Sequence, residues 1–78
     1  MKLIGIIKGE YEGNVYAKII VTEPMNYNRG LGTNAVVSKL AVTEYDRIAP
    51  DFALYENEEV YLVYNRFGRV DRVELAHS

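Results

Sequence analysis

Apolar and polar residues alternate in short runs along this chain, and the runs predict five β-strands. In the second run, the odd positions from 15 to 21 are all apolar and share one face of a strand. Tyr16 and Lys18 fall on the opposite face, which we expect to be exposed. The five predicted strands are residues 2–8, 15–22, 35–43, 60–64 and 69–75.

Turn-forming residues separate these strands. Residues 9–14 contain two glycines and predict a turn after the first strand. Residues 23–33 predict a loop, because Pro24 cannot donate to a strand ladder and asparagines and glycines follow it. Loops of this length in compact domains are often functional, so the segment is a candidate binding element.

One short helix is predicted between the third and fourth strands. Residues 43–49 can form about two helical turns, with Thr43 as the N-cap and Glu44 in the first turn, where a negative charge is favourable. Pro50 ends this helix, because the residue before a proline is pushed out of the α region. Residues 51–58 then form a connector.

The order of three strands, a short helix and two further strands is that of an OB-fold, a five-stranded barrel. We therefore predict a single all-β domain over residues 1–78, a small OB-like barrel with one short helix between strands 3 and 4. An SH3-like or other small barrel is the second interpretation, and an open α+β sheet is the third.

The last third of the chain carries the most informative motif. Strand-like runs flank Asn65-Arg66-Phe67-Gly68, a pattern typical of a β-hairpin in which Gly68 has a positive φ and a G1 bulge closes the turn. The tip carries Arg66, Phe67 and Arg69 together. Two cations beside an exposed ring suit a nucleic-acid base and its phosphate. The alternative is a charged edge, with Phe67 folded back over the hairpin or placed in a dimer seam.

Further aromatic and basic residues lie on the other predicted strands and in the long loop. Tyr16 and Lys18 share a strand face, where they form either a half-exposed cross-strand pair or an aromatic and basic surface strip that Lys39 extends on the third strand. In the loop, Tyr27 and Arg29 form either a lid over their own segment or a base-stacking wing. Strand propensity and the need for core area account for the remaining aromatic residues that we weighed, which are Tyr11, Tyr45, Tyr55 and Phe52.

Composition narrows the classes of function. The chain has no cysteine and a single histidine, so we expect no disulfide, no metal site and no cofactor. No catalytic constellation or phosphate-binding glycine motif is present, so we do not expect an enzyme. The net charge of −2 argues against strong non-specific binding to nucleic acid, while a local basic patch remains compatible with it.

The length of the chain and its first apolar run bear on assembly and location. A chain of 78 residues has a marginal core, so we expect a homodimer. The run Leu3-Ile4-Gly5-Ile6-Ile7 is too short for a signal sequence or a membrane span. We therefore expect a cytoplasmic protein with no membrane contact.

The C-terminal third resembles the gene V type of single-stranded-DNA-binding protein from filamentous phages. The resemblance lies in Ala49-Pro50, Leu54-Tyr55, Phe67-Gly68 and residues 71–75, and in an aromatic, arginine-bearing loop after the second strand. It implies an OB-fold homodimer that coats single strands cooperatively, and a phage or mobile-element setting.

Together these observations predict a protein that binds single-stranded nucleic acid, with DNA favoured over RNA. The rings would stack on bases and the cations would meet phosphates. The predicted binding residues are Tyr16, Lys18, Tyr27, Arg29, Lys39, Arg66, Phe67 and Arg69. The alternative is a protein-interaction or structural module whose exposed aromatic residues form a subunit interface.

Overall fold

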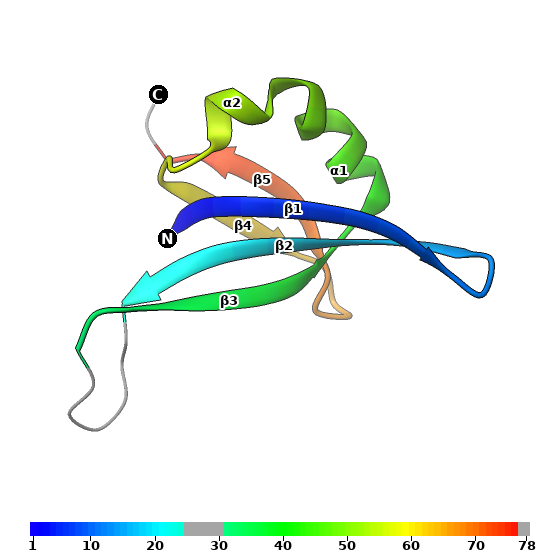
Figure 1. Ribbon diagram of the computed structural model, residues 1–78, viewed down its shortest axis with the longest axis horizontal. Helices are drawn as coiled ribbons and strands as arrows, with labels where there is room; N and C mark the ends of the chain where they lie inside the picture. Colours follow the sequence, from blue (N-terminus) through cyan, green and yellow to red (C-terminus); the bar gives the residue numbers. More distant parts are fainter. Residues whose placement is uncertain (25–30, 77–78) are drawn as a thin grey trace.

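The structure is mostly β, with five strands and a short helical segment between the third and fourth, as the sequence predicts (Figure 1). It is a computed structural model that describes residues 1–24 and 31–76. The elements in chain order are β1 (Lys2–Tyr11), β2 (Asn14–Pro24), β3 (Thr33–Leu40), α1 (Val42–Ile48), the 3-10 helix η1 (Ala49–Asp51), α2 (Phe52–Tyr55), β4 (Val60–Tyr64) and β5 (Val70–Leu75).

The strands form one sheet in the order β1-β2-β3-β5-β4. Neighbouring strands are antiparallel except β3 and β5, which are parallel and pair only at Leu40 and Val70. The sheet is not closed. Its two edge strands, β1 and β4, approach each other at the isolated bridge between Lys2 and Glu59. The observed arrangement is therefore an open five-stranded sheet.

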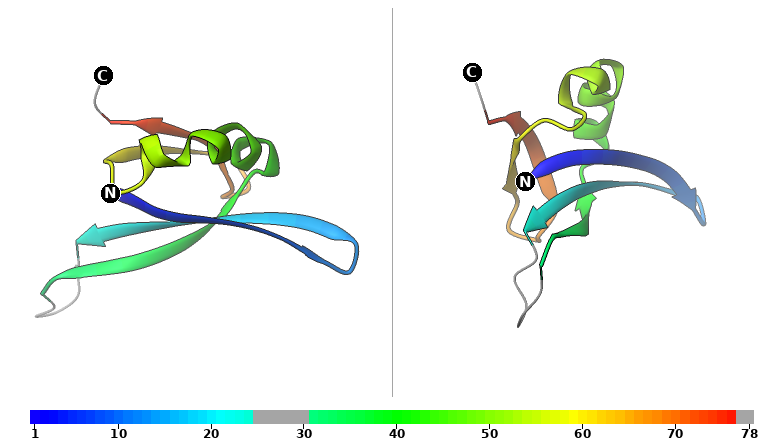
Figure 2. Two further views of the ribbon diagram at one scale, coloured as in Figure 1. Left: turned by 45° about the horizontal axis from the view of Figure 1, so that its top comes forward. Right: turned by 60° about the vertical axis from the view of Figure 1, so that its left-hand side comes forward.

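The core lies between the sheet and the helical segment, in which α1 packs against β1, β2 and β5 (Figure 2). On β2, Ala17, Ile19 and Val21 are buried, which confirms the predicted alternation. The buried apolar side chains among the described residues are Leu3, Ala17, Ile19, Val21, Leu40, Ile48, Val60, Val70 and Val73.

The first hairpin is longer than predicted. β1 continues to Tyr11 and β2 begins at Asn14, so only Glu12 and Gly13 form the turn, with φ values of 51° and 81°. Positive φ at both central residues is typical of a type I′ turn, whose twist matches that of the flanking strands. The turn therefore lies within the predicted residues 9–14 but is shorter than predicted, because residues 9–11 and 14 belong to the strands.

Beyond the pair Ala17 and Leu40, β2 has no partner in β3. The outer part of the β1–β2 hairpin therefore projects beyond the rest of the sheet as a two-stranded ribbon (Figure 1). One edge of β2 is open along this ribbon, next to the point where β3 ends and the chain turns into α1.

The helical segment also differs from the prediction. β3 ends at Leu40, and the N-cap of α1 is Ala41 without a side-chain cap, so the predicted N-cap at Thr43 is wrong. α1 ends at Ile48, two residues before Pro50. A 3-10 turn and α2 then occupy much of the predicted connector, because partly buried Phe52 and Tyr55 pack against the core.

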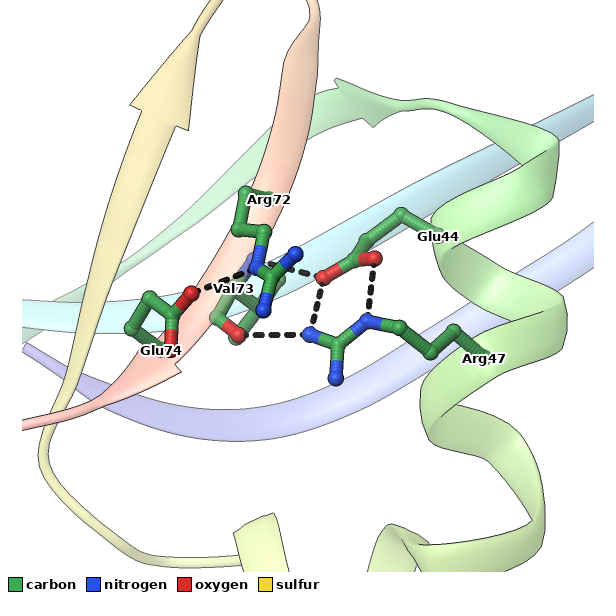
Figure 3. Close-up of polar contacts among 5 residues, drawn as sticks. All are labelled: Glu44, Arg47, Arg72, Val73 and Glu74. Atoms are coloured by element: carbon green, nitrogen blue, oxygen red, sulfur yellow. Dashed lines mark hydrogen bonds and ion pairs between the residues drawn. The ribbon is translucent and has the colours of Figure 1, made fainter.

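Glu44 anchors α1 to β5 (Figure 3). It is the buried charged side chain among the described residues. Its carboxylate accepts hydrogen bonds from Arg47 at 2.7 and 2.5 Å and from the backbone N–H of Val73 at 2.7 Å. Arg47 in turn donates to the carbonyl oxygen of Val73 at 3.0 Å. The two side chains thus satisfy both backbone groups of a β5 residue, as a neighbouring strand would.

Candidate nucleic-acid interface

The register of β1, β2 and β3 places several predicted binding residues on the outer face of the sheet. Tyr16 lies opposite Gly9, and Lys18 lies between Ile7 on β1 and Lys39 on β3. The three predicted binding residues here are exposed, namely Tyr16, Lys18 and Lys39. Lys18 and Lys39 are direct cross-strand partners, so two positive charges face each other without an acid between them.

A pocket of about 230 Å³ brings four of the eight predicted residues together. It lies beside the open edge of β2, where β3 gives way to α1. Tyr16, Lys18, Lys39 and Arg69 contribute its polar and aromatic lining. The apolar lining comes from Val15, Ala17, Leu40 and Val42. Among these described lining residues three are cations and none is an acid, so the pocket suits an anionic, partly apolar ligand.

Three other cations in the described part of the chain are paired with acids. The described ion pairs of side-chain cations join Lys8 to Asp46, Arg47 to Glu44 and Arg72 to Glu74. By contrast, Lys18, Lys39 and Arg69 form no ion pair with any described carboxylate, and the same holds for Arg66 and for Lys2 at the start of β1. None of the four described cations among the predicted binding residues therefore forms such an ion pair.

The β4–β5 hairpin has the predicted turn. Gly68 has a φ of 81°, and its N–H donates to the carbonyl oxygen of Asn65 at 3.1 Å. The side-chain oxygen of Asn65 accepts hydrogen bonds from the N–H groups of Phe67 at 2.8 Å and Arg69 at 3.0 Å. One asparagine side chain thus fixes the shape of the tip from inside, which leaves the flanking side chains free to face solvent.

Phe67 is 75% exposed, so its ring does not fold back over the hairpin. The Arg66 guanidinium carbon lies 5.0 Å from its centroid, within the range of a cation–π contact. Arg69, three residues after Arg66, reaches the pocket lined by Lys18 and Lys39. The hairpin therefore presents one exposed ring and contributes one cation to the pocket.

The structure adds one aromatic residue that the sequence analysis assigned elsewhere. Tyr11 lies in β1 and is 70% exposed, so the need for core area does not explain it, whereas Tyr45, Tyr55 and Phe52 pack against the core as expected. Because β1 continues through Tyr11, this residue lies on the same outer face as Gly9, and Gly9 is the cross-strand partner of Tyr16. Extending the strand periodicity past Gly9 would have located it.

Two predicted binding residues, Tyr27 and Arg29, lie outside the described residues. Within the described ranges, no group of three or more acidic or histidine side chains is placed to hold a metal ion. In the same part of the chain, no helix has the length and apolar character needed to cross a bilayer. Comparison of the chain with protein-family models, with curated proteins and with solved structures gives no match.

Proposed function

We propose that this protein binds single-stranded nucleic acid. The observation that carries the proposal is the pocket at which Lys18, Lys39 and Arg69 converge with no acid among its described lining residues. Phosphates of a single strand would meet these cations, while bases would contact the neighbouring rings. A double-stranded ligand is disfavoured, because stacking on an exposed ring requires bases that are free of a partner strand.

The fold supports this class of ligand. An OB-fold binds oligonucleotides through the face of strands 2 and 3 and through the loops between strands 1 and 2 and between strands 4 and 5. In this chain Lys18 and Lys39 lie on β2 and β3, and Phe67 lies in the loop between β4 and β5. We propose that the open sheet belongs to the OB-like class, with β1 and β4 as the strands that would meet.

Within that class we propose a DNA-binding protein of the gene V type. The residues shared with these phage proteins include Phe67-Gly68, which occupies the exposed tip of the β4–β5 hairpin. This resemblance favours DNA over RNA and favours a homodimer. Tyr27 and Arg29 would contribute a second binding element, the wing that follows the second strand.

A second candidate is an interaction module whose apolar surface forms a subunit interface. β4 is an edge strand, and its side chains Tyr61, Val63 and Tyr64 are each at least 50% exposed. Apolar residues on an open edge are typical of strands that pair with another chain. This surface is compatible with a dimer that also binds nucleic acid, because none of the three residues lines the cationic pocket.

Fluorescence anisotropy with a labelled single-stranded oligonucleotide tests the proposal. The protein should raise the anisotropy at low salt and release the oligonucleotide as salt increases. A duplex of the same sequence should compete poorly. Absence of binding at low salt would leave the interaction module as the better interpretation.

A further inference from the structure

Gly9 makes room for the ring of Tyr16. The two residues are direct cross-strand partners in the β1–β2 ribbon. A Cβ atom built on Gly9 would lie 2.5 Å from the Tyr16 hydroxyl oxygen and 2.7 Å from Cζ. The far end of the ring therefore occupies the volume that any larger side chain would fill. The ring leans across the sheet from β2 onto β1.

Backbone conformation does not explain this glycine. Gly13, Gly32 and Gly68 have positive φ values, whereas Gly9 does not adopt that conformation. Alanine would therefore fit the backbone at position 9, and the three atoms nearest to its Cβ would all belong to Tyr16. The structural consequence of a glycine here is the position of one aromatic ring.

We infer that Gly9 is a positioning residue, which holds the Tyr16 ring against the sheet as a platform for one unpaired base. The inference rests on the proposed binding of single strands. Tyr16 is 41% exposed, so part of the ring is available to a ligand although Gly9 covers another part. An alanine at position 9 would push the hydroxyl end away from the sheet and disturb the stacking surface.

Lys18 supplies the charge beside this platform. Its Nζ lies 5.7 Å from the centroid of the Tyr16 ring, near the outer limit of a cation–π contact. A contact this long at an exposed site is weak, so the ammonium group can exchange it for a phosphate oxygen. A nucleotide at this position would have its base on Tyr16 and its phosphate near Lys18.

The chain offers a matched control for the test. Gly5 lies on the same strand and face, and a Cβ there would lie 3.6 Å from the Ile20 Cδ1 atom, an ordinary van der Waals distance. Gly9→Ala and Gly5→Ala make the same chemical change to the backbone of β1. Only the first displaces a ring that is proposed to bind the ligand.

The experiment measures oligonucleotide affinity by anisotropy for Gly9→Ala, Gly5→Ala, Tyr16→Ala and the double variant Gly9→Ala/Tyr16→Ala. Loss of one stacked base corresponds to roughly 5- to 150-fold weaker binding for Tyr16→Ala. We expect Gly9→Ala to weaken binding in the same direction and Gly5→Ala to leave it unchanged. In the Tyr16→Ala background, Gly9→Ala should have no further effect, because the ring it displaces is gone.

Equal losses for the two glycine variants would overturn the inference, and so would an undiminished effect of Gly9→Ala in the Tyr16→Ala background. If the wild-type chain binds no oligonucleotide, the proposed function itself fails. NMR tests the ring geometry without any ligand. The Gly9 Hα resonances should show an aromatic ring-current shift that Tyr16→Ala removes, and the absence of that shift would overturn the inference without reference to binding.

Discussion

Lys18 on β2 and Lys39 on β3 face each other directly across an antiparallel ladder. Like charges at such a position destabilise a sheet, whereas an opposite-charge pair would stabilise it. Neither lysine forms an ion pair with a described acid, and both line the pocket that Arg69 also reaches. A phosphate between them would relieve the repulsion. The pair therefore lowers the stability of the free protein at the position where the proposed ligand would bind.

Replacing one of these lysines with an acid should separate stability from binding. Lys39→Glu should raise the free energy of unfolding by about 0.2–1 kcal/mol, because it creates an opposite-charge cross-strand pair with Lys18. The same change should weaken oligonucleotide binding and lower the magnitude of the salt slope by about 0.7. Urea denaturation and anisotropy measure the two effects on one sample.

Lys2→Glu is the matched control for that variant. It makes the same change in net charge at a lysine that forms no ion pair with a described carboxylate and does not line the pocket of Lys18, Lys39 and Arg69. Binding should fall much less for Lys2→Glu than for Lys39→Glu. Equal losses would mean that overall charge determines affinity and that the Lys18–Lys39 pair has no special part in it.

Replacing Phe67, at the tip of the β4–β5 hairpin, distinguishes nucleic-acid binding from a subunit interface. Phe67→Ala should weaken oligonucleotide binding by about 1–3 kcal/mol if the ring stacks on a base. The change should leave the melting temperature nearly unaltered, because the side chain is 75% exposed. Loss of assembly with no intrinsic defect in binding would instead assign Phe67 to a subunit interface.

The stability of the fold should depend on pH through Glu44. Burial raises the pKa of this carboxyl, but hydrogen bonds from Arg47 and the Val73 N–H, with the charges of Arg47 and Arg72, bring the net pKa below its ordinary value of 4.5. A carboxyl with a lower pKa in the folded state stabilises the protein fully above its unfolded value. That contribution is lost as the pH falls through the folded value.

Denaturation of wild type and Glu44→Gln across the acid range tests this dependence. The glutamine variant should be less stable at neutral pH and should lose less stability on acidification, since residue 44 no longer titrates. Glu44→Ala should cost about 1–3 kcal/mol, because the buried N–H of Val73 loses its partner. Glu74→Ala, which removes an exposed pair with Arg72, should cost less than about 1 kcal/mol. If the stability of wild type and of Glu44→Gln falls in parallel as the pH is lowered, Glu44 is not the group responsible for the pH dependence.

Assembly is the next expectation. With a small core and no cysteine, we predict a dimer at micromolar concentration. The exposed side chains of Tyr61 and Val63 on edge strand β4 are the proposed contact. Equilibrium sedimentation should give twice the monomer mass of 8.9 kDa, and Tyr61→Lys should shift the equilibrium toward the monomer. A species of 8.9 kDa alone would remove both the dimer and this interface.

Local pattern in the sequence predicts much of this fold. Alternation identified Ala17, Ile19 and Val21 as the inward face of β2, because the period of a strand is two. The turn at Gly68 followed from its residue types, since a positive φ strongly favours glycine. Where the alternation was interrupted, as at Gly9, the sequence analysis ended the strand too early and missed the exposure of Tyr11.

Features that depend on contacts distant in sequence were not predicted. Glu44 was assigned to the helix N-terminus on local grounds, but its main partners include the N–H of Val73, 29 residues away. Likewise, the sequence grouped Lys18 with Lys39 and Arg66 with Arg69, but only the fold shows that Arg69 shares a pocket with Lys18 and Lys39. Pairing between distant segments has no local signature in a single sequence.

The salt dependence of oligonucleotide binding tests the central proposal most directly. A labelled single strand of about 16 nucleotides covers the span of one such domain, and anisotropy is followed at several salt concentrations. Phosphate contacts by the four described cations predict that log K falls with log salt with a slope of about −2.8, or about −3.5 if Arg29 also contributes. No binding at low salt, or binding by wild type and Lys39→Glu with equal affinity and slope, would contradict the proposed nucleic-acid site.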